Sequence, residues 1–130
     1  MLFSDFYWVN PKYIEIWNEL MSVRESITNA FPAQLVKTMC GMSMEKYKAL
    51  KHPYPTIIDK INKYGYDGKQ LHHIIRINEF MRNYISGMSF IDCLKEFSSD
   101  TLQRMTRAKL NDFSLTAAEE LAKDYNDDTV

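Results

Sequence analysis

The chain has 130 residues and a mass of 15.3 kDa, which suits one domain. Apolar residues make up 45% and charged residues 25%, a globular composition that argues against a disordered or collagen-like chain. No apolar run reaches the ~20 residues of a membrane span. The net charge of −1 hides an uneven distribution. Residues 1–36 carry two basic and four acidic groups, and residues 37–109 carry thirteen basic and seven acidic groups. Residues 110–130 carry one basic and six acidic groups, so a basic middle is followed by an acidic end.

The two cysteines, Cys40 and Cys93, are too few for a disulfide framework and predict reduced thiols in a cytoplasmic protein. Together with His52, His72 and His73 they show no metal-ligand spacing, so we expect neither a metal nor another cofactor. A cysteine nucleophile would need a partner histidine that the sequence does not place.

The first ten residues are rich in aromatic side chains, which predicts an extended, buried segment. The apolar members are Phe3, Phe6, Tyr7, Trp8 and Val9. Asn10-Pro11 then predicts a helix start, and apolar residues at helical spacing continue to about Ala30.

Pro32 predicts the start of a second helix that runs to about Leu50, with a break or a close helix contact at Gly41. His52-Pro53-Tyr54-Pro55 predicts a loop, because the residue before a proline is disfavoured in a helix. A short helix, Thr56 to Tyr64, should follow and end at Gly65.

Asp67 predicts the N-cap of the longest amphipathic helix, Gly68 to Ser86, with Gln70 completing a capping box. Further helices are expected over residues 89–97 and 101–110. Thr116-x-x-Glu119 predicts the cap of a last one, followed by a frayed acidic tail. The sequence thus predicts one all-α domain, residues 1–130, as a compact bundle of six or seven helices. An extended aromatic segment, residues 1–10, precedes it and an acidic turn and helix, residues 111–130, end it.

Three basic residues of the long helix fall within roughly 60° of one another, since successive residues turn by about 100°. Lys69, His73 and Arg76 share this face, close to Asp67 and to the N–H groups of the first turn, which favour an anion. The pattern predicts a phosphate site, with a solvated polar face as the alternative. The opposite face should enter the core, through Leu71, Ile74, Ile75, Met81 and Ile85.

Lysines interleaved with tyrosines form a second candidate surface, which could follow a nucleic-acid backbone or be a solvated lysine face. Its members are Lys46, Lys48, Lys51, Lys60, Lys63, Tyr47 and Tyr64.

The stretch Tyr64-Gly-Tyr-Asp-x-Lys-x-x-x-His-x-x-Arg, with Gly87 a helix later, resembles predicted nucleotidyltransferases of the DNA polymerase beta superfamily from phages and bacteria. The segments 2–13, 32–50 and 111–115 are similar to flanking parts of that family's helical half. The resemblance implies that Lys69, His73 and Arg76 lie near nucleotide phosphates.

The family's catalytic half carries a Gly-Ser turn and an Asp-x-Asp pair that holds two metal ions, and this sequence contains neither. We therefore expect a stand-alone helical half that is not an enzyme by itself. Activity would require a separate catalytic chain.

Three functions follow as hypotheses. The chain could bind RNA, DNA or a nucleotide through the cationic triplet. It could be a phage-derived regulator that binds a host protein or nucleoprotein complex, such as an inhibitor of a CRISPR effector or another defence nuclease, with its acidic end mimicking phosphates. It could also be the phosphate-binding subunit of a split nucleotidyltransferase. We favour a non-catalytic binding or inhibitory protein with no membrane partner, and a homodimer through Phe3, Phe6, Tyr7 and Trp8 is a further possibility.

Overall fold

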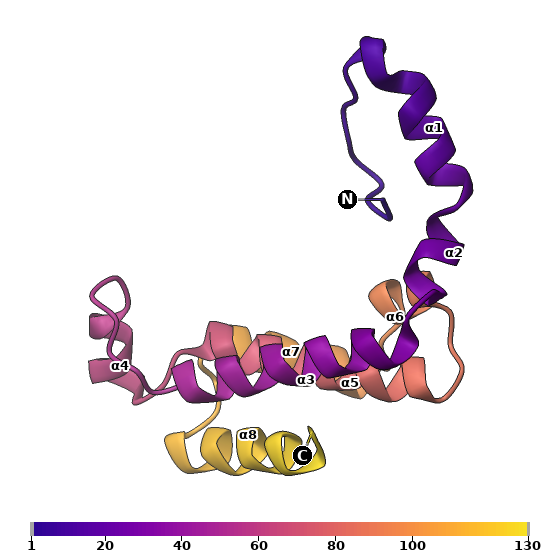
Figure 1. The fold of residues 1–130 in the computed structure, drawn as a ribbon. Coiled ribbons are helices and arrows are strands. Elements are labelled where there is room, and N and C mark those ends of the chain that lie inside the picture. The colour runs from indigo at the N-terminus through magenta and orange to yellow at the C-terminus, as the bar shows by residue number, and fades with distance from the viewer. Residues whose placement is uncertain (1, 130) are drawn as a thin grey trace.

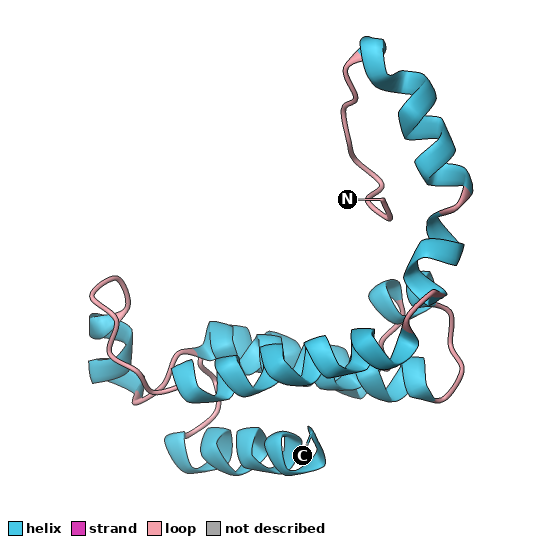
Figure 2. Cartoon of the chain, in the orientation of Figure 1, coloured by secondary structure: helices cyan, strands magenta, loops and turns pink. Residues whose placement is uncertain are grey.

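The computed structural model describes residues 2–129 and confirms the all-α class: this part of the chain forms helices joined by loops, without a strand (Figures 1 and 2). Met1 and Val130, which the predicted domain includes, lie outside the described residues. In chain order the elements are the 3-10 helix η1 (Pro11–Tyr13) and the α-helices α1 (Ile14–Ser22), α2 (Arg24–Asn29), α3 (Pro32–Ala49), α4 (Ile58–Tyr64), α5 (Gly68–Ile85), α6 (Phe90–Lys95), α7 (Ser99–Lys109) and α8 (Leu115–Thr129).

Two parts can be followed in Figure 1, a bundle formed by α3 to α8 and an arm formed by residues 2–31. The long helices α3 and α5 lie along the bundle, with α7 and α8 packed against α5. The arm contains the N-terminal segment, η1, α1 and α2. It rises from the end of the bundle where α6 contacts α2.

The arm begins as predicted but does not contain one continuous helix. The Asn10 side chain accepts a hydrogen bond from the Lys12 amide at 3.0 Å, and Pro11 occupies the first helical position. The helix predicted to reach about Ala30 divides at Val23, whose backbone (φ −112°, ψ 7°) leaves α-helical geometry. With this division the described residues form eight α-helices, which agrees with the predicted bundle of about six or seven.

The prediction that the aromatic N-terminal segment is buried is wrong, because three of its four rings are exposed and Phe3 is half-buried. Phe3 packs on Phe90 with 5.1 Å between ring centroids, and Tyr7 packs on Trp17 at 4.9 Å. Phe6 and Trp8, in contrast, are 92% and 76% exposed. The segment folds back beside α1 (Figure 1) and contacts α6 of the bundle, where Asp5 also pairs with Lys95 at 3.0 Å, but these contacts leave Phe6 and Trp8 uncovered.

The core of the bundle lies around α5. Leu71, Ile74 and Ile75 are fully buried there, as their spacing predicts, and Met81 is buried too. Ile85 instead ends the helix beyond its packing partners and is exposed. Residues of α7, α8 and the α4–α5 connection complete this core: Tyr66, Met105, Ala108, Ala118, Ala122 and Tyr125.

The start of α5 packs directly against the end of α7, with a close backbone contact at Gly68. A Cβ atom on Gly68 would lie 2.5 Å from Oδ1 of Asn111 and still closer to the Ala108 carbonyl oxygen. Asn111 bridges the junction, because its Oδ1 accepts from the Gly68 amide at 3.3 Å and its Nδ2 donates to the Tyr66 carbonyl at 2.9 Å. Glycine at position 68 is therefore required by packing.

Capping at the start of α5 differs from the predicted box. Asp67 is the N-cap and accepts from the Lys69 amide at 3.0 Å, as predicted. The Asp67 amide, however, donates to the Leu50 carbonyl at 2.8 Å and leaves no donor for Gln70, whose buried Oε1 has no hydrogen-bond partner in the described chain.

Two other local predictions are also corrected. The last helix is capped by Ser114, whose Oγ accepts from the Ala117 amide at 3.2 Å, and not by Thr116. Gly41 neither breaks α3 nor allows a close helix contact, since a Cβ there would meet nothing within 4 Å among the described atoms.

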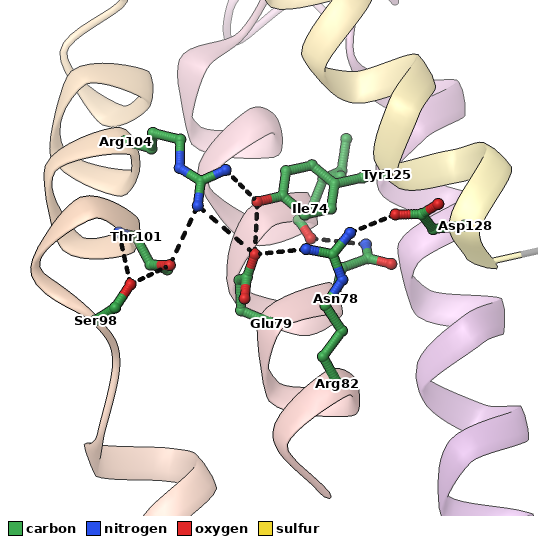
Figure 3. Close-up of polar contacts among 9 residues, drawn as sticks. All are labelled: Ile74, Asn78, Glu79, Arg82, Ser98, Thr101, Arg104, Tyr125 and Asp128. Carbon is green, nitrogen blue, oxygen red and sulfur yellow. Dashed lines mark hydrogen bonds and ion pairs between the residues drawn. The ribbon is translucent and has the colours of Figure 1, made fainter. Parts of the chain in front are cut away.

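The acidic C-terminal region is an ordered part of the bundle and not a frayed tail. It forms α8, which packs on α3 and α5. Near its end Asp128 forms an ion pair with Arg82 (Figure 3). In the same network Glu79 accepts from the Tyr125 hydroxyl at 2.8 Å and pairs with Arg82 at 3.0 Å and with Arg104 at 3.8 Å, which ties α5, α7 and α8 together.

Candidate phosphate-binding site

The three basic residues predicted on one face of α5 line adjoining hollows of the surface. His73 lies between the other two and lines both hollows. The structure places Lys69 beside His73 in the first hollow and Arg76 beside His73 in the second. The predicted triplet is therefore not one cluster, although its order along the helix face agrees with the 3.6-residue period.

The first hollow is a cationic pocket of about 300 Å³. Three helices supply its lining, which is Lys60 from α4, Lys69, His72 and His73 from α5, and Lys109 from α7. None of these five described lining residues is acidic. A pocket that concentrates ammonium and imidazole groups in this way attracts a phosphate or another compact anion.

The ionisation of His73 reflects this setting. Burial, followed by the neighbouring His72, Lys46, Lys69 and Arg76, lowers the pKa of His73 below its ordinary value. In the free protein its ring is therefore mainly neutral at pH 7. A bound anion would oppose the positive neighbours and raise that pKa again.

Asp67, predicted at the phosphate site, has a different place. Its carboxylate is only 2% exposed, caps α5 and lies 3.4 Å from Nζ of Lys60. It therefore positions Lys60 at the edge of the pocket, and its negative charge would repel a phosphate. The first-turn amides expected to help bind an anion are occupied too, because the Gly68 amide donates to Asn111 and the Lys69 amide to Asp67.

His72 is a member of the pocket that the sequence did not single out for phosphate binding. Its Nδ1 lies 3.3 Å from the Met105 carbonyl oxygen. Because a carbonyl oxygen can only accept, Nδ1 carries the proton in this contact. The rings of His72 and His73 lie 5.6 Å apart, edge to face.

Lys109 was also missed. It lies forty residues after Lys69, and no spacing rule connects the two. The Gly68–Asn111 contact brings the end of α7 to the start of α5 and thereby places Lys109 at the pocket.

The second hollow, of about 480 Å³, is a groove between α3, α5 and α6. Lys46 and Arg76 are its cationic residues, and His73 lies beside Arg76 in the lining. The remaining lining is mostly apolar and consists of Leu35, Thr38, Met39, Met42, Ile77, Phe80, Phe90 and Leu94. Positive charge therefore continues along the α5 face from the cationic pocket to this groove.

The accessory lysine and tyrosine surface is dispersed in the structure. Lys60 lines the cationic pocket and Lys46 the groove. Lys51 instead pairs with Glu119 at 2.7 Å beside α8. Tyr47 and Lys48 line a third hollow together with Lys51, and the lining of this hollow includes Glu119 and Glu120. Lys63 lies over the Tyr64 ring, with Nζ 4.9 Å from the ring centre.

The cysteines are placed as packing residues. Cys93 is fully buried, and burial raises the pKa of its thiol. The thiol of Cys40 contacts the Met81 sulfur at 3.7 Å. Within residues 2–129 no three His, Cys, Asp or Glu side chains gather as a possible metal site. Likewise, no helix in this range is long and apolar enough to cross a membrane.

Comparisons with protein-family models, curated proteins and solved structures find no significant match to the chain. The nucleotidyltransferase resemblance therefore stays a prediction.

Proposed function

We propose that the protein is a non-catalytic binding protein that holds phosphate groups of a nucleic acid or nucleotide in the cationic pocket. The observation that carries this proposal is the convergence of Lys60, Lys69, His72, His73 and Lys109 from three helices without an acidic lining residue in the described chain. Solvated lysines usually spread over a surface. Here they share one hollow of about 300 Å³, which suits one or two phosphate groups.

A nucleic acid fits this surface better than an isolated anion does. Beyond the pocket, Arg76 of α5 and Lys46 of the neighbouring α3 extend the positive charge along the groove, so successive phosphates of one strand could be contacted. Arginine adds a planar donor pair that suits phosphate oxygens.

A regulatory role in a host nucleoprotein complex would, in this proposal, act through the nucleic acid. Phosphate mimicry by the acidic end has less support, because Glu119 and Asp128 form ion pairs with Lys51 and Arg82 within the chain. These carboxylates stabilise the docking of α8 on the bundle.

Replacing Lys69 and Lys109 by alanine should weaken binding of a twelve-nucleotide single strand by roughly 10- to 100-fold at low salt, because two phosphate contacts are lost. The slope of log affinity against log salt should fall by about 1.4, at ~0.7 per contact for a single strand. Fluorescence anisotropy over a salt series measures both quantities. A parallel titration with a nucleoside triphosphate distinguishes a nucleotide ligand from a nucleic acid.

The matched control replaces Lys37 and Lys123, which carry the same charge and lie outside the cationic pocket. Its affinity and salt slope should remain close to those of the unmodified chain. The proposal fails if neither ligand binds, or if both double variants lose affinity equally.

Binding should also strengthen as the pH falls. The phosphodiester backbone keeps its charge between pH 8 and 5.5, while His73, whose pKa is lowered in the free protein, gains a proton on binding an anion. We expect several-fold tighter binding at pH 5.5 than at pH 8, and a flatter profile for His73→Gln. His52→Gln, in the exposed loop, should retain the dependence. If the pH dependence of binding is unchanged in His73→Gln, His73 does not take part in phosphate binding.

A further inference from the structure

The arm concentrates the exposed apolar surface of the molecule. Ten of the nineteen large apolar side chains that are exposed in the described chain belong to it, although it spans only residues 2–31. They are Phe6, Tyr7, Trp8, Tyr13, Ile14, Ile16, Leu20, Val23, Ile27 and Phe31. An apolar surface of this extent marks an interaction site.

We propose that the arm pairs with the arm of a second copy of this chain. The seam is an apolar stripe along α1 and α2, formed by Ile16, Leu20, Val23 and Ile27. Ile16 and Leu20 lie one turn apart on α1, and the Ile27 amide donates to the Val23 carbonyl at 3.0 Å, so each pair lies on one face of its helix on either side of the division at Val23. All four are at least 40% exposed.

The other side of the arm is already covered within the chain. Trp17 is buried against Tyr7, and the Arg24 guanidinium lies 5.1 Å from the centre of the Phe3 ring while donating to the Leu2 carbonyl at 3.2 Å. The stripe therefore faces outward, and each of its residues is 40–58% exposed in the described chain. Because Phe3 and Tyr7 have ring partners of their own, the predicted dimer contact moves to Phe6, Trp8 and the stripe.

The exposed area is sufficient for a stable pair. Fully exposed large apolar side chains present roughly 150–250 Å² each, so the exposed fractions of the stripe, Phe6 and Trp8 correspond to on the order of 600 Å² of apolar surface. A specific interface needs about 800 Å² from each partner, of which roughly two thirds is apolar in homodimers. Two arms can thus supply a complete interface.

The apolar character and net negative charge of the arm favour a protein partner, and in particular a second copy of the chain. Residues 2–31 carry two basic and four acidic groups, so an anionic lipid surface or a nucleic acid would be repelled. The stripe itself has no charged member. It can therefore face its own copy across a two-fold axis without burying an unpaired charge.

Sedimentation velocity and light scattering of the full chain test this proposal. We expect a species of twice 15.3 kDa at roughly 10 μM protein. Leu20→Glu combined with Ile27→Glu should raise the dimer dissociation constant by ~100-fold or more, since two apolar members of the stripe in each copy become four carboxylates in the interface. Circular dichroism should show that helix content is retained.

The matched control is Ile85→Glu with Leu102→Glu, two exposed apolar residues of the bundle that change the charge equally. It should remain dimeric. A second variant, Phe6→Ser with Trp8→Ser, lies in a loop where it cannot disturb a helix, and it should also weaken the dimer. A monomeric wild-type chain at roughly 100 μM overturns the proposal, as does a dimer that both arm variants leave unchanged.

Discussion

Gly68→Ala is expected to destabilise the folded chain by about 3 kcal/mol or more and to lower the melting temperature by on the order of 10 °C. The new methyl group would lie 2.5 Å from Oδ1 of Asn111 and closer still to the Ala108 carbonyl oxygen. Neither neighbour can yield cheaply, because one is backbone and the other bridges Gly68 to Tyr66. Helices α5 and α7 must separate, and thermal unfolding followed by circular dichroism measures the loss.

Gly41→Ala is the matched control. It makes the same chemical change inside α3, where the added Cβ meets nothing within 4 Å of the described chain. The free energy of unfolding of Gly41→Ala should rise by about 0.5–1 kcal/mol, because alanine has a better helix propensity than glycine. Equal melting temperatures for the two variants would contradict the close contact. The same contact places Lys109 beside Lys69, so Gly68→Ala should also weaken phosphate binding.

Glu79→Ala is expected to cost about 2–3 kcal/mol, because it removes the carboxylate shared by the Tyr125 hydroxyl, Arg82 and Arg104 (Figure 3). Tyr125 is buried, and its hydroxyl would lose an acceptor that water cannot easily replace. Urea unfolding at pH 7 measures the change. Glu45→Ala, at an exposed position of α3, should stay within about 0.5 kcal/mol of the unmodified chain.

The same carboxylate gives stability a dependence on alkaline pH. Burial and the hydrogen bond to Glu79 raise the pKa of Tyr125 to about 12, against 10.0 for the ordinary side chain. As the pH rises from 10 to 12, the unfolded chain loses a proton that the folded chain retains, so this contribution to stability is lost. The loss should be smaller in Glu79→Ala. An identical alkaline decline in both proteins would show that Glu79 does not set it.

Local signals in the sequence predicted the helices well. Asn10-Pro11, Phe31-Pro32 and Asp67 each begin a helix where expected, because a capping side chain or a proline acts on its own turn. Gly65 ends α4 with φ +84°, as expected for a glycine C-cap. The predictions for Gln70 and Thr116 were wrong because competing partners, the Leu50 carbonyl and Ser114, lie outside the capping pattern.

The positions of residues on different helices relative to one another were harder to predict from the sequence. Helical periodicity correctly put Lys69, His73 and Arg76 on one face of α5, but it could not show that Lys109 returns to that face or that Arg76 lines a separate groove. The sequence pattern also shows that a side chain is apolar, but it does not show whether another part of the chain packs over that side chain. For this reason the exposure of Phe6 and Trp8 was not predictable from their aromatic character.

Both tryptophans of the chain, Trp8 and Trp17, lie in the arm, whereas most helical residues lie in α3 to α8. Intrinsic tryptophan fluorescence therefore reports on the arm, and far-ultraviolet circular dichroism reports mainly on the bundle. Trp8 is exposed and Trp17 buried, so the emission spectrum combines a solvated and a shielded indole. Unfolding followed by both signals can separate loosening of the arm from melting of the bundle, without any added label.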